Sequence, residues 1–251
     1  MQLLTFSRRS TLAVMAFGLL AACGSANGDS TPATAGPALN DMVLGDPDAP
    51  VTLIEYASVT CGACYQFHRD VVPNIVERFI EPGDVKFIFR EFPTPPANVA
   101  VAGFAIARCA GPDKYFDVID DLFDSQQGII EAARIGAVRP ALEAVAARHG
   151  IEGAEAFDAC LADRDIRQAI ADTVLGGEEF GVSSTPTLIL QGEVLPSTMQ
   201  SRTPEGLSSL IEAELAALGR TVTSAESDNT STDSEDAVSS ENADAAADAD
   251  N

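Results

Sequence analysis

Short apolar runs of strand length alternate with longer helical stretches through the middle of this 251-residue chain. Residues 51–57 and 85–90 are such runs, and their density of apolar side chains is typical of buried strands. A third run begins after Pro186 and ends at a Gln-Gly turn, and a further strand is expected near Val194. The pattern therefore predicts a sheet whose strands come from distant parts of the sequence.

Helical periodicity fills the intervals between these runs. Apolar residues recur every four positions over residues 62–79, which predicts one helix with a single apolar face. Pro73 lies inside this helix and has no backbone N–H to donate, so we expect a kink there. Residues 98–180 are almost entirely helical in pattern, and the leucines over residues 207–218 indicate a terminal helix.

The N-terminal 23 residues have the pattern of a signal peptide. Arg8 and Arg9 precede an apolar run that is too short for a good membrane-spanning helix. The run ends in Leu-Ala-Ala-Cys23, which resembles the bacterial lipoprotein box and implies that Cys23 is lipidated and becomes the first residue after cleavage. An ordinary cleaved signal peptide is the alternative. Similarity to a twin-arginine export motif is weak, because Thr11 replaces the usual Phe.

Composition separates the two flanks from the middle of the chain. Residues 24–40 are small, polar and proline-containing, which predicts a flexible tether. Residues 221–251 hold nine acidic residues, no Lys or Arg and no aromatic residue, which predicts a disordered acidic tail. The whole chain has a formal net charge of −23, which argues against nucleic acid or an anionic membrane surface as its partner.

The main chemical signal is a pair of cysteines, Cys61 and Cys64, placed where the strand at 51–57 gives way to a helix. A cysteine at a helix N-terminus lies beside unpaired backbone N–H groups and the positive end of the helix dipole, and both favour the thiolate. The second cysteine, one turn further on, can form a disulfide with the first. This order makes Cys61 the exposed attacking thiol and Cys64 the more buried one. The alternatives are a plain structural disulfide or half of a zinc site, and the sequence offers no two further zinc ligands at suitable spacing.

The residues around this pair resemble the active-site segment of the DsbA-like thiol–disulfide oxidoreductases of the thioredoxin superfamily. The similarity lies in Glu-Tyr-Ala-Ser at 55–58 and Cys-Gly-Ala-Cys-Tyr-Gln-Phe at 61–67. It implies an α/β thioredoxin-like fold in residues 41–97 and 181–220, beginning with a short edge strand, and a helical domain inserted at 98–180. The Gly-Ala dipeptide departs from the Pro-His of the best-known members, which leaves the redox potential open.

Two further positions gain a role from this resemblance. It implies that Pro186 follows a cis peptide bond and faces the cysteine pair, which would leave the backbone of Thr185 free to pair with an extended substrate chain. An ordinary trans proline is the alternative. Glu55 interrupts an apolar strand, so we expect it partly buried under the site, where a carboxyl of raised pKa can exchange a proton with Cys64. The alternative is a Glu55 at the strand edge that faces water.

The remaining histidines and cysteines receive lesser roles. His68 is expected to face either solvent or the helical domain, and His149 to lie on the surface at a helix C-terminus. Cys109 and Cys160 are left over once Cys23 and the redox pair are assigned. Five cysteines that include a close pair suit an oxidising compartment, which favours a structural disulfide between these two over two buried free thiols.

Together with the resemblance, these residues predict an enzyme that introduces disulfide bonds into exported proteins through Cys61 and Cys64. The resemblance implies a quinone-linked membrane partner for re-oxidation, and the chemistry requires no metal or organic cofactor. We expect a monomer on the periplasmic side of the bacterial cell envelope, held at a membrane by the lipid on Cys23. The alternatives are a reductase or isomerase that runs the same chemistry backwards, and a non-catalytic lipoprotein that binds peptides or a metal.

Overall fold

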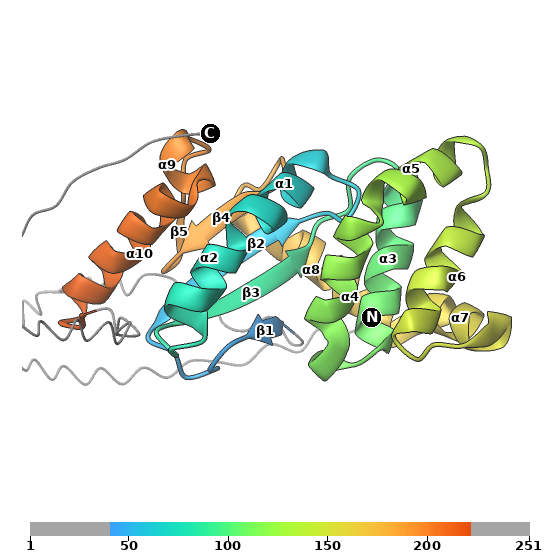
Figure 1. Cartoon of the computed structure of the whole chain (residues 1–251), viewed down its shortest axis with the longest axis horizontal. Coiled ribbons are helices and arrows are strands. Elements are labelled where there is room, and N and C mark those ends of the chain that lie inside the picture. Colours follow the sequence, from blue (N-terminus) through green and yellow to red (C-terminus); the bar gives the residue numbers. More distant parts are fainter. Residues whose placement is uncertain (1–40, 222–251) are drawn as a thin grey trace, which may run out of the picture. The chain divides into compact units, whose positions relative to one another are not determined.

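The computed structural model describes residues 41–221, so the predicted signal peptide with Cys23, the tether and nearly all of the acidic tail lie outside the described residues. Within this range one mixed sheet has the strand order β1-β3-β2-β4-β5 (Figure 1). β2 and β3 are parallel, and the other neighbouring pairs are antiparallel. The strands are β1 (Met42–Leu44), β2 (Val51–Ala57), β3 (Val85–Glu91), β4 (Thr187–Leu190) and β5 (Glu193–Val194).

β2 is the central strand and is almost entirely buried. Its side chains alternate between two apolar clusters, Leu53 in the larger one and Ile54 in the smaller one. Glu55, the one charged residue of the strand, is opposite Phe89 in β3 and Leu188 in β4. Because both edges of β2 are paired, the chain that leaves its carboxyl end starts from a fixed position in the middle of the sheet.

The segment after β2 is helical but divided. α1 (Gly62–Asp70) is followed by α2 (Val72–Ile75) and by the π-helical segment η1 (Val76–Ile80). The single helix predicted over residues 62–79 is therefore broken at Val71, and the kink expected from Pro73 is confirmed. The physical reason is that Pro73 has no N–H to give to the carbonyl four residues earlier.

A group of helices lies between β3 and β4 in the sequence and, for the most part, at one end of the sheet in space (Figure 1). It shares a core with the sheet, since the ring of Phe89 in β3 is 6.2 Å from that of Phe104 and 6.5 Å from that of Phe123. No helix in residues 41–221 is long and apolar enough to cross a bilayer. The helices are α3 (Ala97–Cys109), the short η2 (Pro112–Lys114), α4 (Tyr115–Asp124), α5 (Gln126–Arg134), α6 (Val138–Arg148), α7 (Gly153–Ala162) and α8 (Arg164–Glu179).

Two further helices follow β5, namely α9 (Met199–Arg202) and α10 (Pro204–Ala217). Thr203 caps α10 by accepting a hydrogen bond from the N–H of Gly206, and Pro204 takes the first helical position, where a missing N–H costs nothing. Leu207, Ile211 and Leu215 face the larger core cluster. The terminal helix predicted from the leucines at 207–218 is thus present and packs against the rest of the fold.

A buried ion pair fastens the inserted helices to the sheet. Arg108 in α3 donates two hydrogen bonds to the carboxylate of Glu91 at the end of β3, at 2.6 and 2.8 Å. The hydroxyl of Tyr115 in α4 donates to the same carboxylate at 2.8 Å. Removing one partner from such a pair leaves a buried charge without compensation, so this contact fixes how the helices meet the sheet.

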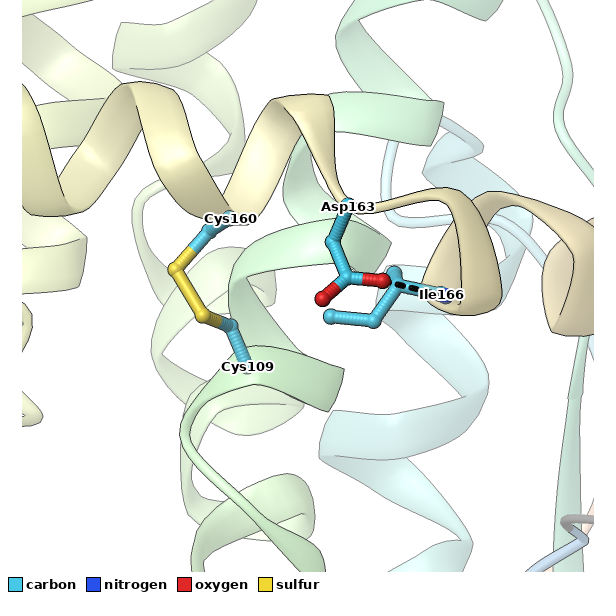
Figure 2. Close-up of a disulfide and its surroundings, with 4 residues drawn as sticks. All are labelled: Cys109, Cys160, Asp163 and Ile166. Atoms are coloured by element: carbon cyan, nitrogen blue, oxygen red, sulfur yellow. Dashed lines mark hydrogen bonds between the residues drawn. A yellow bond between two sulfur atoms is a disulfide. The ribbon is translucent and has the colours of Figure 1, made fainter.

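A disulfide joins Cys109, at the end of α3, to Cys160 in α7, with 5.6 Å between their Cα atoms (Figure 2). Asp163, shortly after it, caps α8 by accepting hydrogen bonds from the N–H groups of Asp165 and Ile166 at 2.8 and 3.0 Å. The bond closes a loop of 51 residues within the helical part of the molecule. It lies apart from the Cys61–Cys64 pair, whose thiols are free.

Replacing both cysteines of this bond by alanine should lower the free energy of unfolding by about 4 kcal/mol. Without the bond, the unfolded chain gains the conformational entropy that the closed loop withholds from it. Urea denaturation followed by circular dichroism measures the difference. The variant Cys61→Ala/Cys64→Ala, with the Cys109–Cys160 bond intact, is the matched control. Equal unfolding midpoints for the wild-type protein and the Cys109→Ala/Cys160→Ala variant would contradict the expectation.

Candidate active site

Cys61 caps the N-terminus of α1. Its backbone is extended (φ −90°, ψ 118°), and its Sγ accepts a hydrogen bond from the N–H of Cys64 at 3.3 Å. Its side chain therefore takes the place of the Ser, Asp or Asn that usually satisfies the first free N–H groups of a helix. The sulfur is only half-buried, so it remains open to an incoming thiol.

The environment of Cys61 favours the thiolate. The pKa of its thiol is lowered to about 6, above all by a hydrogen bond from the Cys64 side chain. Partial burial opposes this effect, and contacts with Thr185 and with the backbone N–H groups of Cys64 and Ala63 reinforce it. Cys61 is consequently a nucleophile and a good leaving group at neutral pH.

Cys64 has the opposite character. It is fully buried, and burial raises the pKa of its thiol far above the usual range. The hydrogen bond to Cys61 and the negative charge of Glu55 raise it further. Cys64 must therefore gain a proton whenever it leaves a disulfide and lose one whenever it forms one.

The Thr185–Pro186 peptide bond is cis and brings the chain to the cysteines. The carbonyl oxygen of Thr185 lies 3.4 Å from Sγ of Cys61. Arg202 in α9 donates to the carbonyl of Pro186 and, at 3.1 Å, to the hydroxyl of Ser197. Beside this loop is a groove of about 360 Å³, lined by Ala63, Gln66, Phe67, Asp70, Val71, Ser184, Thr185, Pro186, Ser197 and Arg202.

Glu55 is fully buried on the side of β2 that faces α1. Its Oε2 is 2.8 Å from Nε2 of His68, and no hydrogen-bond partner of its Oε1 occurs in residues 41–221. The reading of Glu55 as a strand-edge residue in contact with water is therefore wrong. Its charge acts on the Cys64 thiol, so it belongs to the surroundings of the reacting sulfurs.

His68 is a site residue that sequence reasoning undervalued. It is buried, so the alternative that it faces solvent is wrong. The alternative that it faces the helical domain is confirmed, since its ring lies 4.4 Å from that of Phe123 in α4 and 5.7 Å from that of Phe89. Burial of the ring lowers its pKa, but the charge of Glu55 and interactions with Asp120 outweigh burial and raise the pKa to about 9. A usable signal was present, since position 68 is one turn after Cys64 and falls on the buried face of the helix.

Other residues hold the site from outside the cysteine segment. The side-chain amide of Gln126, the first residue of α5, donates to the carbonyls of Val59 and Cys61 at 2.9 and 3.1 Å.

His149 follows α6, as the sequence predicts, with Nε2 3.0 Å from Oδ2 of Asp121. In residues 41–221 no three His, Cys, Asp or Glu side chains gather as a metal site would require. Nothing in the sequence singled out Gln126 or Arg202.

Comparison with known proteins agrees with this geometry. A sequence model of the thioredoxin family matches residues 38–213, and the chain belongs to that family. A crystal structure of alpha-DsbA1 from Wolbachia pipientis superposes with a TM-score of 0.59 at 27% identity, over 72% of this chain and 95% of that one. The protein is thus a DsbA-like member of the thioredoxin superfamily, with an α/β thioredoxin-like fold that carries inserted helices.

Two relatives are similar to this chain in sequence. The disulfide bond formation protein D of Bacillus subtilis is 36% identical over 86 residues, which are 34% of this chain and 39% of that protein. A protein of Rickettsia bellii is 27% identical over 165 residues, which are 61% of this chain and 58% of the relative. The matched part of this chain therefore covers between 39% and 58% of the length of these two relatives.

The lowered pKa of Cys61 predicts the pH dependence of its alkylation. The rate at which iodoacetamide modifies the reduced protein should rise as pH increases and reach half of its maximum near pH 6, because only the thiolate reacts. Mass spectrometry of quenched samples gives the rate. The variant Cys61→Ser should lack the fast reaction, and a midpoint near that of a free cysteine, about pH 8.5, would contradict the expectation.

The buried pair of Glu55 and His68 predicts a pH-dependent stability. Glu55→Gln should lower the free energy of unfolding by roughly 3–5 kcal/mol near neutral pH, because it removes one partner of a buried pair. The folded-state pKa of His68 lies above its unfolded value of 6.5, so the stabilisation is complete below pH 6.5 and is lost as pH rises through about 9. Urea denaturation at several pH values measures the difference in free energy of unfolding between the wild-type protein and Glu55→Gln. The titration of Cys61 contributes to both proteins and cancels in this difference. A difference that stays constant from pH 6 to pH 10 would show that the pair does not hold a proton.

Proposed function

We propose that this protein is a thiol–disulfide oxidoreductase that introduces disulfide bonds into exported proteins through Cys61 and Cys64. The observation that carries the proposal is the contrast between the two thiols. Cys61 is half-exposed with a pKa of about 6, whereas Cys64 is buried with a pKa raised far above the usual range. A plain structural disulfide needs no such contrast, but an exchange reaction at one chosen sulfur does.

The reaction proceeds in two exchanges. A substrate thiolate attacks Cys61 in the Cys61–Cys64 disulfide, a mixed disulfide forms at Cys61, and Cys64 leaves and takes up a proton. A second substrate thiolate then attacks the substrate sulfur of the mixed disulfide, and Cys61 leaves as a thiolate. Two electrons pass from the substrate thiols to the protein. The two substrate thiols lose two protons, of which one is taken up by Cys64 and one is released to solvent.

The direction towards oxidation follows from the stability of the Cys61 thiolate. Whatever stabilises the thiolate stabilises the reduced protein, and a stable reduced form makes the disulfide a stronger oxidant. The name of the Bacillus subtilis relative, disulfide bond formation protein D, supports the same direction. The Gly-Ala dipeptide lacks the histidine of the best-known members and leaves the redox potential open, so a reductase or isomerase is the alternative.

The substrates are reduced exported proteins that bind as extended chains along the groove at Pro186. The carbonyl oxygen of Thr185 lies 3.4 Å from Sγ of Cys61, where the backbone can pair with a substrate strand. Re-oxidation requires an acceptor of two electrons, for which a quinone-linked membrane protein is the partner that the family resemblance implies. Neither step needs a bound metal or organic cofactor.

The place of action is the periplasmic side of the bacterial cell envelope, where the protein is held at a membrane by lipid on Cys23 and works as a monomer. The support for this part is the lipoprotein-box pattern, which lies outside the described residues. The disulfide between Cys109 and Cys160 suits an oxidising compartment.

The decisive measurement is the reduction potential of the Cys61–Cys64 pair, obtained by equilibration with glutathione buffers. We expect a value above that of thioredoxin and towards that of strong oxidants, about −120 mV, because the pKa of Cys61 is lowered to about 6. Reduced RNase A should regain activity when incubated with the oxidised protein and should not regain it with Cys61→Ser. A potential near that of thioredoxin, about −270 mV, would reverse the proposed direction of electron flow.

A further inference from the structure

Three polar side chains form a line from beneath the cysteines to the surface. Glu55 of β2 is 0% exposed, His68 of α1 is 5% exposed, and Asp120 of α4 is 68% exposed. Nε2 of His68 is 2.8 Å from Oε2 of Glu55, and Nδ1 is 3.6 Å from Oδ1 of Asp120. The imidazole thus lies between a buried carboxylate and one in contact with water.

Apart from the contact with Glu55, the surroundings of His68 leave one side polar. Its ring packs against phenylalanines from three elements, with Phe67 on its own helix, Phe87 and Phe89 on β3 and Phe123 on α4. Its remaining opening is a surface pocket of about 560 Å³ that it lines together with Asp120. Asp120 is in contact with water in this pocket, whereas Glu55 and Nδ1 of His68 are buried.

A pair that served stability alone would use its hydrogen-bonding capacity. Two atoms of this pair do not, because within residues 41–221 neither Oε1 of Glu55 nor Nδ1 of His68 has a hydrogen-bond partner. Unsatisfied buried polar atoms are costly and call for an explanation. Oε1 belongs to the carboxylate whose charge acts on the Cys64 thiol, so the pair keeps an unused proton acceptor near the group that gains and loses a proton. Nδ1 faces the carboxylate of Asp120 at 3.6 Å.

We propose that His68 supplies the proton that Cys64 gains when the disulfide opens and takes it back on re-oxidation, with Glu55 carrying it between them. This inference deepens the function proposed above and rests on it. It assigns to His68 a role in proton transfer and to Asp120 a positioning role beside Nδ1.

When the Cys61–Cys64 bond opens, an S–H bond forms on Cys64, the Nε2–H bond of His68 breaks, and Glu55 carries the proton between them. The neutral imidazole keeps the hydrogen on Nδ1, which faces the carboxylate of Asp120. On re-oxidation the S–H bond of Cys64 breaks, and Glu55 carries the proton back to Nε2 of His68.

The charges that face this path set its pH range. Glu55 and Asp120 face His68 directly, and the phenylalanines fill the other sides. Arg202 of α9 acts electrostatically on Glu55 and on both cysteines. The other charged residues that line the pocket are Arg69, Glu77, Glu81 and Asp124. With a pKa of about 9, His68 carries its proton at neutral pH and is ready to donate it.

The test is a single-turnover measurement. The oxidised protein is mixed with dithiothreitol in a rapid-quench instrument, and free thiols are counted by alkylation and mass spectrometry from pH 5.5 to pH 9.5. Asp120→Asn should slow opening of the disulfide about tenfold at neutral pH, and His68→Gln about 100-fold with loss of the decline near pH 9. Asp117→Asn removes an exposed carboxylate from the same helix and is the matched control, with a rate equal to that of the wild-type protein.

A second readout does not depend on the folding of a His68 variant. The chain has two histidines, so NMR of histidine labelled with ¹⁵N in the imidazole ring follows His68 with His149 as the internal reference. In the wild-type protein His68 should titrate near pH 9, and in the Asp120→Asn variant it should titrate at a lower pH, because a charge that stabilises the imidazolium is gone.

The outcomes separate the two proposals. Equal rates and pH profiles for the wild-type protein, Asp120→Asn and Asp117→Asn would overturn the role of His68 and leave the oxidoreductase function standing. A wild-type disulfide that does not react with dithiothreitol would overturn both. Slow opening in Asp120→Asn together with a normal rate in Asp117→Asn supports the proton path.

Discussion

The chemistry of this protein depends on where α1 begins. β2 is paired on both edges, so the turn that follows Ala57 is held in place and delivers Cys61 to the first free N–H groups of the helix. One turn later the same helix passes into the core and takes Cys64 with it. A single helix start thus places two identical side chains in opposite electrostatic environments, with the pKa of one lowered and that of the other raised.

The inserted helices support this arrangement from outside. Gln126 at the start of α5 holds two carbonyls of the active-site turn, and Phe123 of α4 covers the ring of His68. The Glu91–Arg108 ion pair joins the end of β3 to α3 and so fixes the distance between sheet and helices. The insertion is therefore part of the active site, because its contacts decide which groups are buried next to the cysteines.

Local sequence was sufficient for some of these features. The position of Cys61 and Cys64 at a strand-to-helix transition follows from apolar periodicity and needs no tertiary information, as does the break near Pro73. The buried state of Glu55 was expected because a charge in the middle of an apolar strand has no exposed face to use. His68, Gln126 and Arg202 were missed or undervalued, since their roles arise only when α4, α5 and α9 meet segments that are not adjacent in the sequence.

The disulfide between Cys109 and Cys160 must itself be formed by oxidation as each new chain matures. Under the proposed function, this protein contains the kind of bond that it makes, between two cysteines outside the Cys61–Cys64 pair. A newly exported chain is then itself a substrate, and finished copies can complete the next ones. Maturation of this kind accelerates as the product accumulates, and the first molecules in a compartment need an oxidant from another source.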